Sequence, residues 1–123
     1  MKVLVVDDNA LIRSMVKDFL TDMGHEVVGE ADNGNDAIKL FAATRPELVL
    51  LDLIMPGKNG IETLKEIKAI DRGARVVMVT AVQQDSVSKD LLSKGAAAIL
   101  NKPFMYSELE ALLKPADKLP GTI

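Results

Sequence analysis

The chain has 123 residues, of which 48% are hydrophobic and 27% are charged, and its net charge is −3. This length and composition predict one folded domain with a substantial core rather than a disordered chain. The acidic balance disfavours a non-specific nucleic-acid binder, which would need a basic face. Because the chain has no cysteine and a single histidine, His25, a disulfide scaffold and a His-rich zinc site are excluded and a Ser-His triad is disfavoured.

The first residues and the apolar runs bear on where the protein works. The opening MKVLVVDD has one lysine and five apolar residues before two acidic ones, which is too few apolar residues for a signal peptide. No apolar run in the sequence approaches the roughly 20 residues that a membrane-spanning helix needs. We therefore expect a cytoplasmic protein with no membrane partner.

Five short apolar runs alternate along the chain with longer amphipathic stretches. The runs are mostly continuous, which is typical of strands buried on both faces of a parallel sheet. Val27–Val28 gives the weakest of these signals. We predict strands at Val3–Val6, Val27–Val28, Leu48–Leu51, Val76–Val79 and Ala96–Leu100.

The stretches between the runs carry apolar residues at helical spacing. The longest pattern extends from Leu11 to Met23, and Gly24 follows where a helix C-cap belongs. Four further helices are expected, with stops near Pro46, Gly73, Gly95 and Pro115. They are marked by Ala37, Ile38 and Phe41; by Ile61, Leu64, Ile67 and Ile70; by Val87, Leu91 and Leu92; and by Leu109, Leu112 and Leu113.

The resulting order is a strand and then a helix, repeated five times. Right-handed crossovers then place helices on both faces of one parallel sheet, which defines an α/β, doubly wound (βα)5 fold. We assign residues 1–114 to this domain. Residues 115–123 carry two prolines and a glycine, which predict a tail or the start of a linker.

Polar residues follow four of the predicted strands. Asp7 and Asp8 follow the first run, Asp52 the third, Thr80 the fourth and Lys102 the fifth. In an open α/β sheet, binding and catalytic residues lie beyond the carboxyl ends of the strands. If these four strands are neighbours, the polar residues converge on one pocket.

Such a pocket would suit phosphoryl transfer. Three carboxylates together repel one another, which raises their pKa values unless a cation compensates. Oxygen ligands without His or Cys select a hard ion, and Mg²⁺ is the natural choice because it also accepts a phosphate oxygen. With Lys102 as a second cation and Thr80 as a hydroxyl donor, one carboxylate could act as the nucleophile.

Four segments carry a resemblance to a known family. Together they resemble the receiver domain of two-component response regulators, the CheY-like family, over about residues 2–113. The resemblance implies the strand order 2-1-3-4-5 that flavodoxin and CheY share. The segments are LVVDD (4–8), LLDLIMPGKNG (50–60), VMVTA (77–81) and LNKPF (100–104).

The resemblance implies a phospho-acceptor and a metal site. Asp52 would accept a phosphoryl group from a phosphohistidine of a sensor histidine kinase or a histidine phosphotransfer protein. Asp8 would bind Mg²⁺ directly, Asp7 would hold it mainly through water, and Asp52 and the backbone carbonyl of Ile54 would complete the site. The domain would be a signalling protein rather than a turnover enzyme, with no direct contact to nucleic acid.

The resemblance also implies a switch. Thr80 would turn toward the phosphoryl group, the backbone N–H of Ala81 would donate to it, and Lys102 would pair with its oxygens. Pro103 resembles the family's cis proline. An unknown output partner would bind the face made by the fourth helix, the fifth strand and the fifth helix.

Three apolar residues depart from the family pattern. Many members have Tyr or Phe three residues before the lysine, whereas this chain has Ile99, which cannot report activation by swinging a ring. Two positions that tune hydrolysis in the family hold Ile54 and Val82. Neither side chain can orient a water molecule by hydrogen bonding, so we expect the phosphoryl group to be lost slowly.

The same residues bear on other possible functions. An aspartyl-phosphate phosphatase needs a second aspartate two residues after the nucleophile, and Asp52 is followed by Leu53 and Ile54. An FMN binder needs a hydroxyl- and Gly-rich first loop, and the Asp-Asp-Asn-Ala loop at 7–10 would repel the phosphate. Asp7 and Asp8 could instead cap the first helix. A phosphorylation-independent interaction module on the same fold stays open.

Overall fold

The computed structural model describes residues 1–113, and within that range five strands and five helices alternate along the chain. The strands pair in parallel in the order β2-β1-β3-β4-β5, which confirms the predicted topology. The strands are β1 (Lys2–Val6), β2 (Glu26–Ala31), β3 (Leu48–Asp52), β4 (Arg75–Thr80) and β5 (Ala98–Asn101). The helices are α1 (Ala10–Asp22), α2 (Gly34–Thr44), α3 (Gly60–Ile70), α4 (Asp85–Ser93) and α5 (Tyr106–Leu112).

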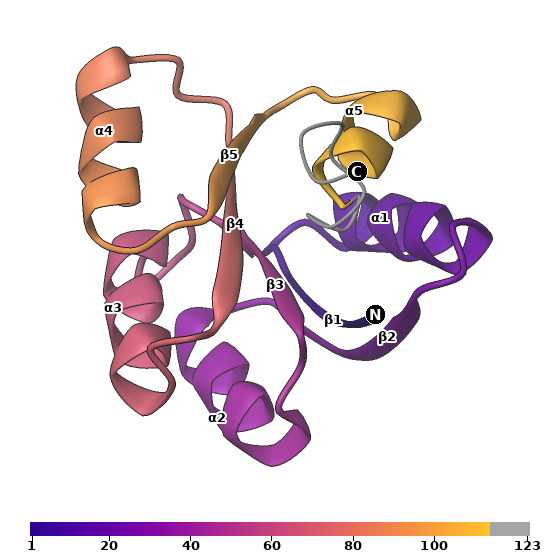
Figure 1. Ribbon diagram of the computed structural model, residues 1–123, viewed down its shortest axis with the longest axis horizontal. Helices are drawn as coiled ribbons and strands as arrows, with labels where there is room; N and C mark the ends of the chain where they lie inside the picture. The colour runs from indigo at the N-terminus through magenta and orange to yellow at the C-terminus, as the bar shows by residue number, and fades with distance from the viewer. Residues whose placement is uncertain (114–123) are drawn as a thin grey trace, which may run out of the picture.

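The helices cover both faces of the sheet (Figure 1). α1 and α5 pack on one face, where alternate strand residues such as Val3 and Val5 point into the core. α2, α3 and α4 pack on the other face, toward which Leu4 and Val6 point. This two-sided burial explains why the strand segments are continuous apolar runs rather than alternating ones.

Two strands differ from the prediction by more than one residue at an end, and the other three by a single residue at one or both ends. β2 is longer than Val27–Val28 and continues through Gly29 and Glu30 to Ala31, because an edge strand tolerates partly exposed and polar residues. β5 begins at Ala98 rather than Ala96. The N–H of Ala96 donates to the Leu91 carbonyl, so this residue still belongs to the turn that ends α4.

That turn and the one after α1 are both Schellman motifs built on a glycine with positive φ. Gly24 has φ +88° and Gly95 has φ +105°, in the left-handed region where glycine carries no steric penalty. After Gly24, the N–H of His25 donates to the carbonyl of Leu20. The predicted stops at Gly24 and Gly95 are therefore confirmed.

The helices differ in how they begin. α1, α2 and α3 start after Asn9, Asn33 and Asn59, and each asparagine side chain accepts backbone N–H groups of the first turn. α4 starts after Gln84, whose side chain makes no such bond within the described residues. Asparagine is among the most favourable N-cap residues and stabilises a helix start by about 1 kcal/mol relative to alanine.

Two sequence predictions concern the end of the chain. The stop at Pro115 and the boundary between residues 1–114 and the tail 115–123 lie outside the described residues. Over residues 1–113, no helix is both long and apolar enough to cross a membrane.

Candidate functional site

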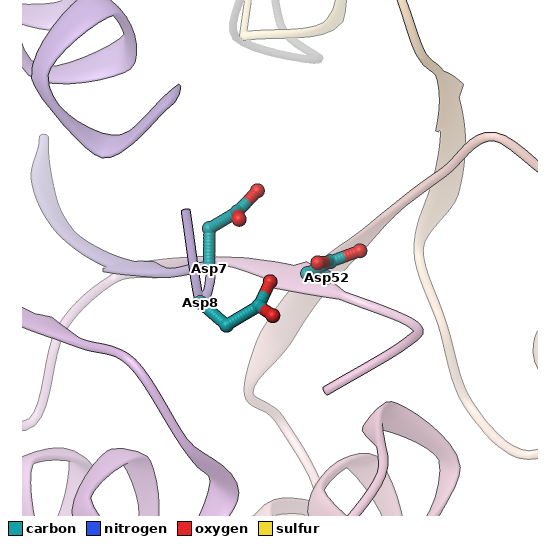
Figure 2. Close-up of side chains that lie close together, drawn as sticks. All are labelled: Asp7, Asp8 and Asp52. Atoms are coloured by element: carbon teal, nitrogen blue, oxygen red, sulfur yellow. The ribbon is translucent and has the colours of Figure 1, made fainter. Parts of the chain in front are cut away.

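Three carboxylates gather at the carboxyl ends of β1 and β3 (Figure 2). Asp52 is the last residue of β3, and Asp7 and Asp8 directly follow β1. Carboxylate oxygens of the three residues lie within 4.8 Å of one another. Asp7 and Asp52 are buried, whereas Asp8 is exposed at the mouth of the site. The predicted convergence is confirmed for all three residues.

Lys102 places an ammonium group against two of these carboxylates. Its Nζ donates to Asp7 Oδ2 at 2.7 Å and lies 3.4 Å from Asp52 Oδ2. Burial alone would lower the pKa of Lys102, but the hydrogen bond to Asp7 and the charge of Asp52 outweigh it and raise that pKa above 10.5. The lysine therefore stays protonated, and Asp7 is its nearest partner.

The pKa of Asp52 reflects its buried position among other charges. Burial raises the pKa of its carboxyl group above the ordinary value of 3.8, and the neighbouring charge of Asp7 raises it further. The charge of Lys102 and a hydrogen bond from the Ile54 backbone N–H offset part of that shift. An added cation would stabilise the ionised form of a desolvated carboxylate that faces another carboxylate.

The donor set fits a magnesium ion. Three carboxylates face one lysine, so the cluster keeps an excess of negative charge. All of its ligand atoms are oxygens, and the exposed Asp8 leaves room for the water ligands that Mg²⁺ retains. Asp7, Asp8 and Asp52 are therefore suitable ligands for a hard divalent cation. The role of the Ile54 carbonyl stays a prediction.

Thr80 and its neighbours form the other side of the site. Thr80 ends β4 with 1% of its surface exposed, and its Oγ1 accepts the backbone N–H of Val82 at 2.9 Å. Ala81 is exposed next to it. The backbone N–H of Lys102 donates to the Thr80 carbonyl at 2.8 Å, which ties the start of the β5–α5 loop to β4. The Lys102–Pro103 bond is cis, as predicted.

The three departures from the family pattern lie on the face of the sheet that α4 covers. Ile54, two residues after Asp52, is 64% exposed. Together with Val82 it lines an apolar groove of about 390 Å³ between the β3–α3 loop and α4. Ile99 in β5 is half-buried and packs against the core under α2, α3 and α4. Apolar walls therefore border the acidic pocket on the α4 side.

Asn9 settles one alternative that the sequence left open. Its Oδ1 accepts the N–H groups of Leu11 and Ile12 at 2.9 and 3.1 Å, so Asn9 is the N-cap of α1. The carboxylates of Asp7 and Asp8 are thereby left for the pocket. The reading of these two residues as helix caps is wrong.

Gly60 is a site residue whose role the sequence reasoning missed. A Cβ atom at this position would lie 2.5 Å from the Asp52 carbonyl oxygen and 2.6 Å from Leu53 Cα. Its N–H donates to the Leu53 carbonyl at 2.8 Å. Only glycine lets α3 begin this close to the end of β3. The available signal was the asparagine before it, which forms a capping box with Glu62.

Comparison with known proteins places this site in a family. A family model described as the response regulator receiver domain matches residues 3–114. The chain is 44% identical over 114 residues to the chemotaxis protein CheY of Bacillus subtilis (strain 168), covering 92% of this chain and 95% of that protein. It is 38% identical over 117 residues to CheY of Thermotoga maritima, covering 95% and 98%.

Solved structures agree with the sequence comparison. CheY in a CheX–CheY–BeF₃–Mg²⁺ complex from Borrelia burgdorferi superposes with a TM-score of 0.88 at 28% identity, covering 93% of this chain and 90% of that one. The chain belongs to the response regulator receiver domain family. It is a CheY-like receiver of the kind found in two-component and chemotaxis response regulators.

Proposed function

We propose that this receiver takes a phosphoryl group onto Asp52 from a phosphohistidine on a sensor histidine kinase or a histidine phosphotransfer protein. The observation that supports the proposal is the convergence of Asp7, Asp8 and Asp52 with Lys102 in one pocket at the carboxyl ends of the strands. A carboxylate nucleophile, an acidic cluster fit for Mg²⁺ and a lysine together meet the needs of phosphoryl transfer.

In this proposal a carboxylate oxygen of Asp52 attacks phosphorus while the bond between phosphorus and the histidine nitrogen breaks. The nitrogen keeps the bonding electron pair, and Asp52 becomes an aspartyl phosphate. Mg²⁺ held by Asp7, Asp8 and Asp52 would neutralise charge on the transferred group. Lys102 lies 3.4 Å from Asp52 and could turn from Asp7 toward the phosphoryl oxygens. The backbone N–H of Ala81 would supply a further donor.

The added phosphoryl charge would then act on Thr80. Phosphorylation of a side chain adds about −1.5 to −2 charges and strong acceptor oxygens. The Thr80 hydroxyl would turn toward these oxygens, and the α4-β5-α5 face would repack to bind an output partner. Because Ile99 replaces the usual aromatic residue, that readout would rest on backbone and helix movement rather than on a ring.

The aspartyl phosphate should be long-lived, so the domain acts as a signalling protein and not as a turnover enzyme. Ile54 and Val82 flank the pocket with apolar side chains that offer no hydrogen bond to an attacking water. Polar substitutions at these two positions should therefore speed the loss of the phosphoryl group. A fast loss in the wild type that such substitutions leave unaltered would contradict this part of the proposal.

The proposal is tested by intact-mass measurement after incubation with Mg²⁺ and acetyl phosphate. We expect a gain of one phosphoryl group that needs Mg²⁺ and is absent in Asp52→Asn. The matched control, Asp18→Asn, removes an exposed carboxylate of α1 and should still be phosphorylated. No gain in the wild type, under conditions that phosphorylate a known receiver, would favour the phosphorylation-independent interaction module.

A further inference from the structure

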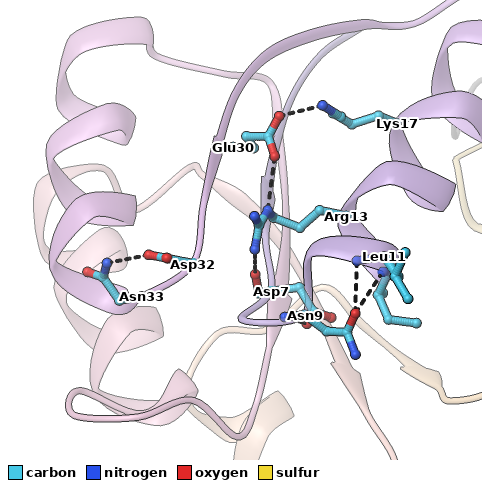
Figure 3. A network of polar contacts seen from close by, with 9 residues as sticks. Asp7, Asn9, Leu11, Arg13, Lys17, Glu30, Asp32 and Asn33 are labelled. Atoms are coloured by element: carbon cyan, nitrogen blue, oxygen red, sulfur yellow. Dashed lines mark hydrogen bonds and ion pairs between the residues drawn. The ribbon is translucent and has the colours of Figure 1, made fainter.

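A chain of polar contacts starts at Asp7, one of the three carboxylates, and links the end of β1 to α1 and β2 (Figure 3). At its centre is Arg13, on the first turns of α1, with 17% of its side chain exposed. Its Nη1 donates to the backbone carbonyl of Asp7 at 2.7 Å, and its Nε donates to Glu30 Oε1 at 2.9 Å. One guanidinium group thus joins a strand end to a neighbouring strand.

The contact to Asp7 fixes the peptide unit between the two acidic residues. The Asp7 N–H donates to the Ala31 carbonyl at 3.0 Å, which anchors the amino side of the residue. The side-chain oxygen Oδ1 of Asp7 accepts a hydrogen bond from the Asn9 N–H at 2.8 Å. Because a peptide unit is planar, holding the Asp7 carbonyl also sets the direction in which Asp8 leaves the chain.

Glu30 in turn fixes the guanidinium. It accepts hydrogen bonds from Lys17 and Arg13, and these bonds, Lys17 first, hold the pKa of its carboxyl group below the ordinary value. Glu30 therefore stays ionised under neutral conditions and orients the planar fork of Arg13 from the side opposite to Asp7. Lys17 contacts Glu30 and not the acidic pair.

We propose that Arg13 is a positioning residue for the cation site. It holds the Asp7 carbonyl so that Asp7 and Asp8 present their carboxylates in the arrangement that binds Mg²⁺, and Glu30 holds Arg13. This inference rests on the proposed magnesium site and deepens it. Residues that orient metal ligands through hydrogen bonds typically change metal affinity by about 10- to 100-fold when they are removed.

Charge and geometry make opposite predictions for this residue. As a positive charge, Arg13 repels Mg²⁺, so its loss would tighten binding. As a fork that holds the Asp7 carbonyl, its loss would weaken binding. Arg13→Lys separates the two effects because lysine keeps the charge but cannot reproduce the rigid two-armed contact. Arg13→Gln removes both the charge and the fork.

The test is calorimetric titration of the unphosphorylated full-length protein with Mg²⁺. We expect Arg13→Lys and Arg13→Gln each to weaken Mg²⁺ binding by about tenfold. Glu30→Gln, which leaves Arg13 in place, should weaken binding less and in the same direction. Arg72→Gln removes an arginine charge from the α3–β4 turn, at the amino ends of the strands and away from the site. It should leave the Mg²⁺ affinity within about twofold of the wild type.

A kinetic readout separates positioning from general damage. At saturating Mg²⁺, Arg13→Lys should be phosphorylated by acetyl phosphate at a near wild-type maximal rate, while its half-saturating Mg²⁺ concentration rises about tenfold. A folded Arg13→Lys with wild-type affinity, or a tighter-binding Arg13→Gln, would overturn the inference. If the arginine variants do not fold, an unchanged affinity in Glu30→Gln would overturn it. A wild type that binds no Mg²⁺ would overturn the proposed magnesium site itself.

Discussion

The two sides of the pocket are held in different ways. On the β1–α1 side, Asp7 is tied through its N–H, its carbonyl and its carboxylate, to Ala31, Arg13 and Lys102 respectively. On the β4–α4 side, the Thr80 hydroxyl accepts one hydrogen bond among the described residues, from the nearby Val82 N–H. The Asp7 carboxylate, which we propose as a cation ligand, is therefore held by a distant part of the fold. The Thr80 hydroxyl, which we propose as the switch group, is held locally, although the Thr80 carbonyl accepts the distant Lys102 N–H.

The helix starts follow the same division. α1 begins at the capping residue Asn9 beside the acidic pair, whereas α4 begins at Gln84 without a side-chain cap within residues 1–113. An uncapped helix start leaves backbone N–H groups to solvent and opens at lower free-energy cost. In the proposed function, the β1–α1 side would bind the cation with little movement, and the β4–α4 side would rearrange when Asp52 is phosphorylated.

The largest expected effect is that of Gly60→Ala, at the start of α3 and against the end of β3, the strand between β1 and β4. Its Cβ would overlap backbone atoms of Asp52 and Leu53, which cannot rotate away. We expect a loss of about 3 kcal/mol in the free energy of unfolding, measured by urea denaturation. Gly73→Ala is the matched control, because its Cβ would meet only Asp71 Oδ1 at 3.4 Å, and it should be nearly neutral. Equal losses in both variants would contradict the close packing at Gly60.

The helix caps give the next largest effect. Asn9→Ala should lower the free energy of unfolding by about 1 kcal/mol, because two N–H groups of α1 lose their acceptor. Gln84→Asn should raise it by up to about 1 kcal/mol, because Gln84 already has the extended backbone of a capping residue. Thermal unfolding measures both. A stabilising Asn9→Ala or a destabilising Gln84→Asn would erase the contrast between the two helix starts.

The pH dependence of stability in Asp52→Asn tests the residue that lies between the two sides, at the end of β3. Burial and the charge of Asp7 raise the Asp52 pKa, so the folded state holds a proton at this carboxyl more tightly than the unfolded chain does. Its ionisation costs stability at neutral pH, and that cost disappears as pH falls through the raised pKa toward 3.8. Without Mg²⁺, Asp52→Asn should be more stable than the wild type at about pH 7 and nearly equal to it below about pH 4. The measurement is urea unfolding across pH, with Asp18→Asn as the control for charge alone.

The smallest effect concerns a contact between the start of α5 and the end of α1. Tyr106 donates to Asp22 Oδ2 at 2.6 Å and packs edge-on against Phe19. The hydrogen bond to Asp22 raises the pKa of Tyr106 to about 12. Because the chain has one tyrosine and no tryptophan, ultraviolet titration reports this residue alone. Asp22→Asn should bring the pKa back toward 10.0, and a wild-type value already near 10.0 would contradict the contact.

Sequence reasoning located the residues of the candidate site because of a simple topological constraint. A polar residue directly after a buried parallel strand emerges at one edge of the sheet, so Asp7, Asp52 and Thr80 had to converge once the strands were neighbours. Lys102 was predicted to pair with a phosphoryl group, and in this structure its nearest partner is Asp7. Local sequence patterns do not predict the tertiary distances that decide which of these partners Lys102 contacts.

The supporting residues were harder to find. Arg13 and Glu30 belong to a helix and to the strand with the weakest signal, and their contact depends on how α1 lies against β2. Gly60 looks like an ordinary loop glycine until α3 is placed against the end of β3. Local patterns predict elements and their ends, whereas approaches between separate elements follow from packing of the whole core.

We propose that phosphorylation of Asp52 moves the β4–α4 side of the pocket and leaves the β1–α1 side in place. Amide hydrogen exchange of the Mg²⁺-loaded protein, with and without acetyl phosphate, tests it most directly. We predict altered exchange in the β4–α4 loop, α4 and β5, with little change in α1 and the Asp7–Asn9 turn. Equal changes on both sides, or changes confined to α1, would contradict the account.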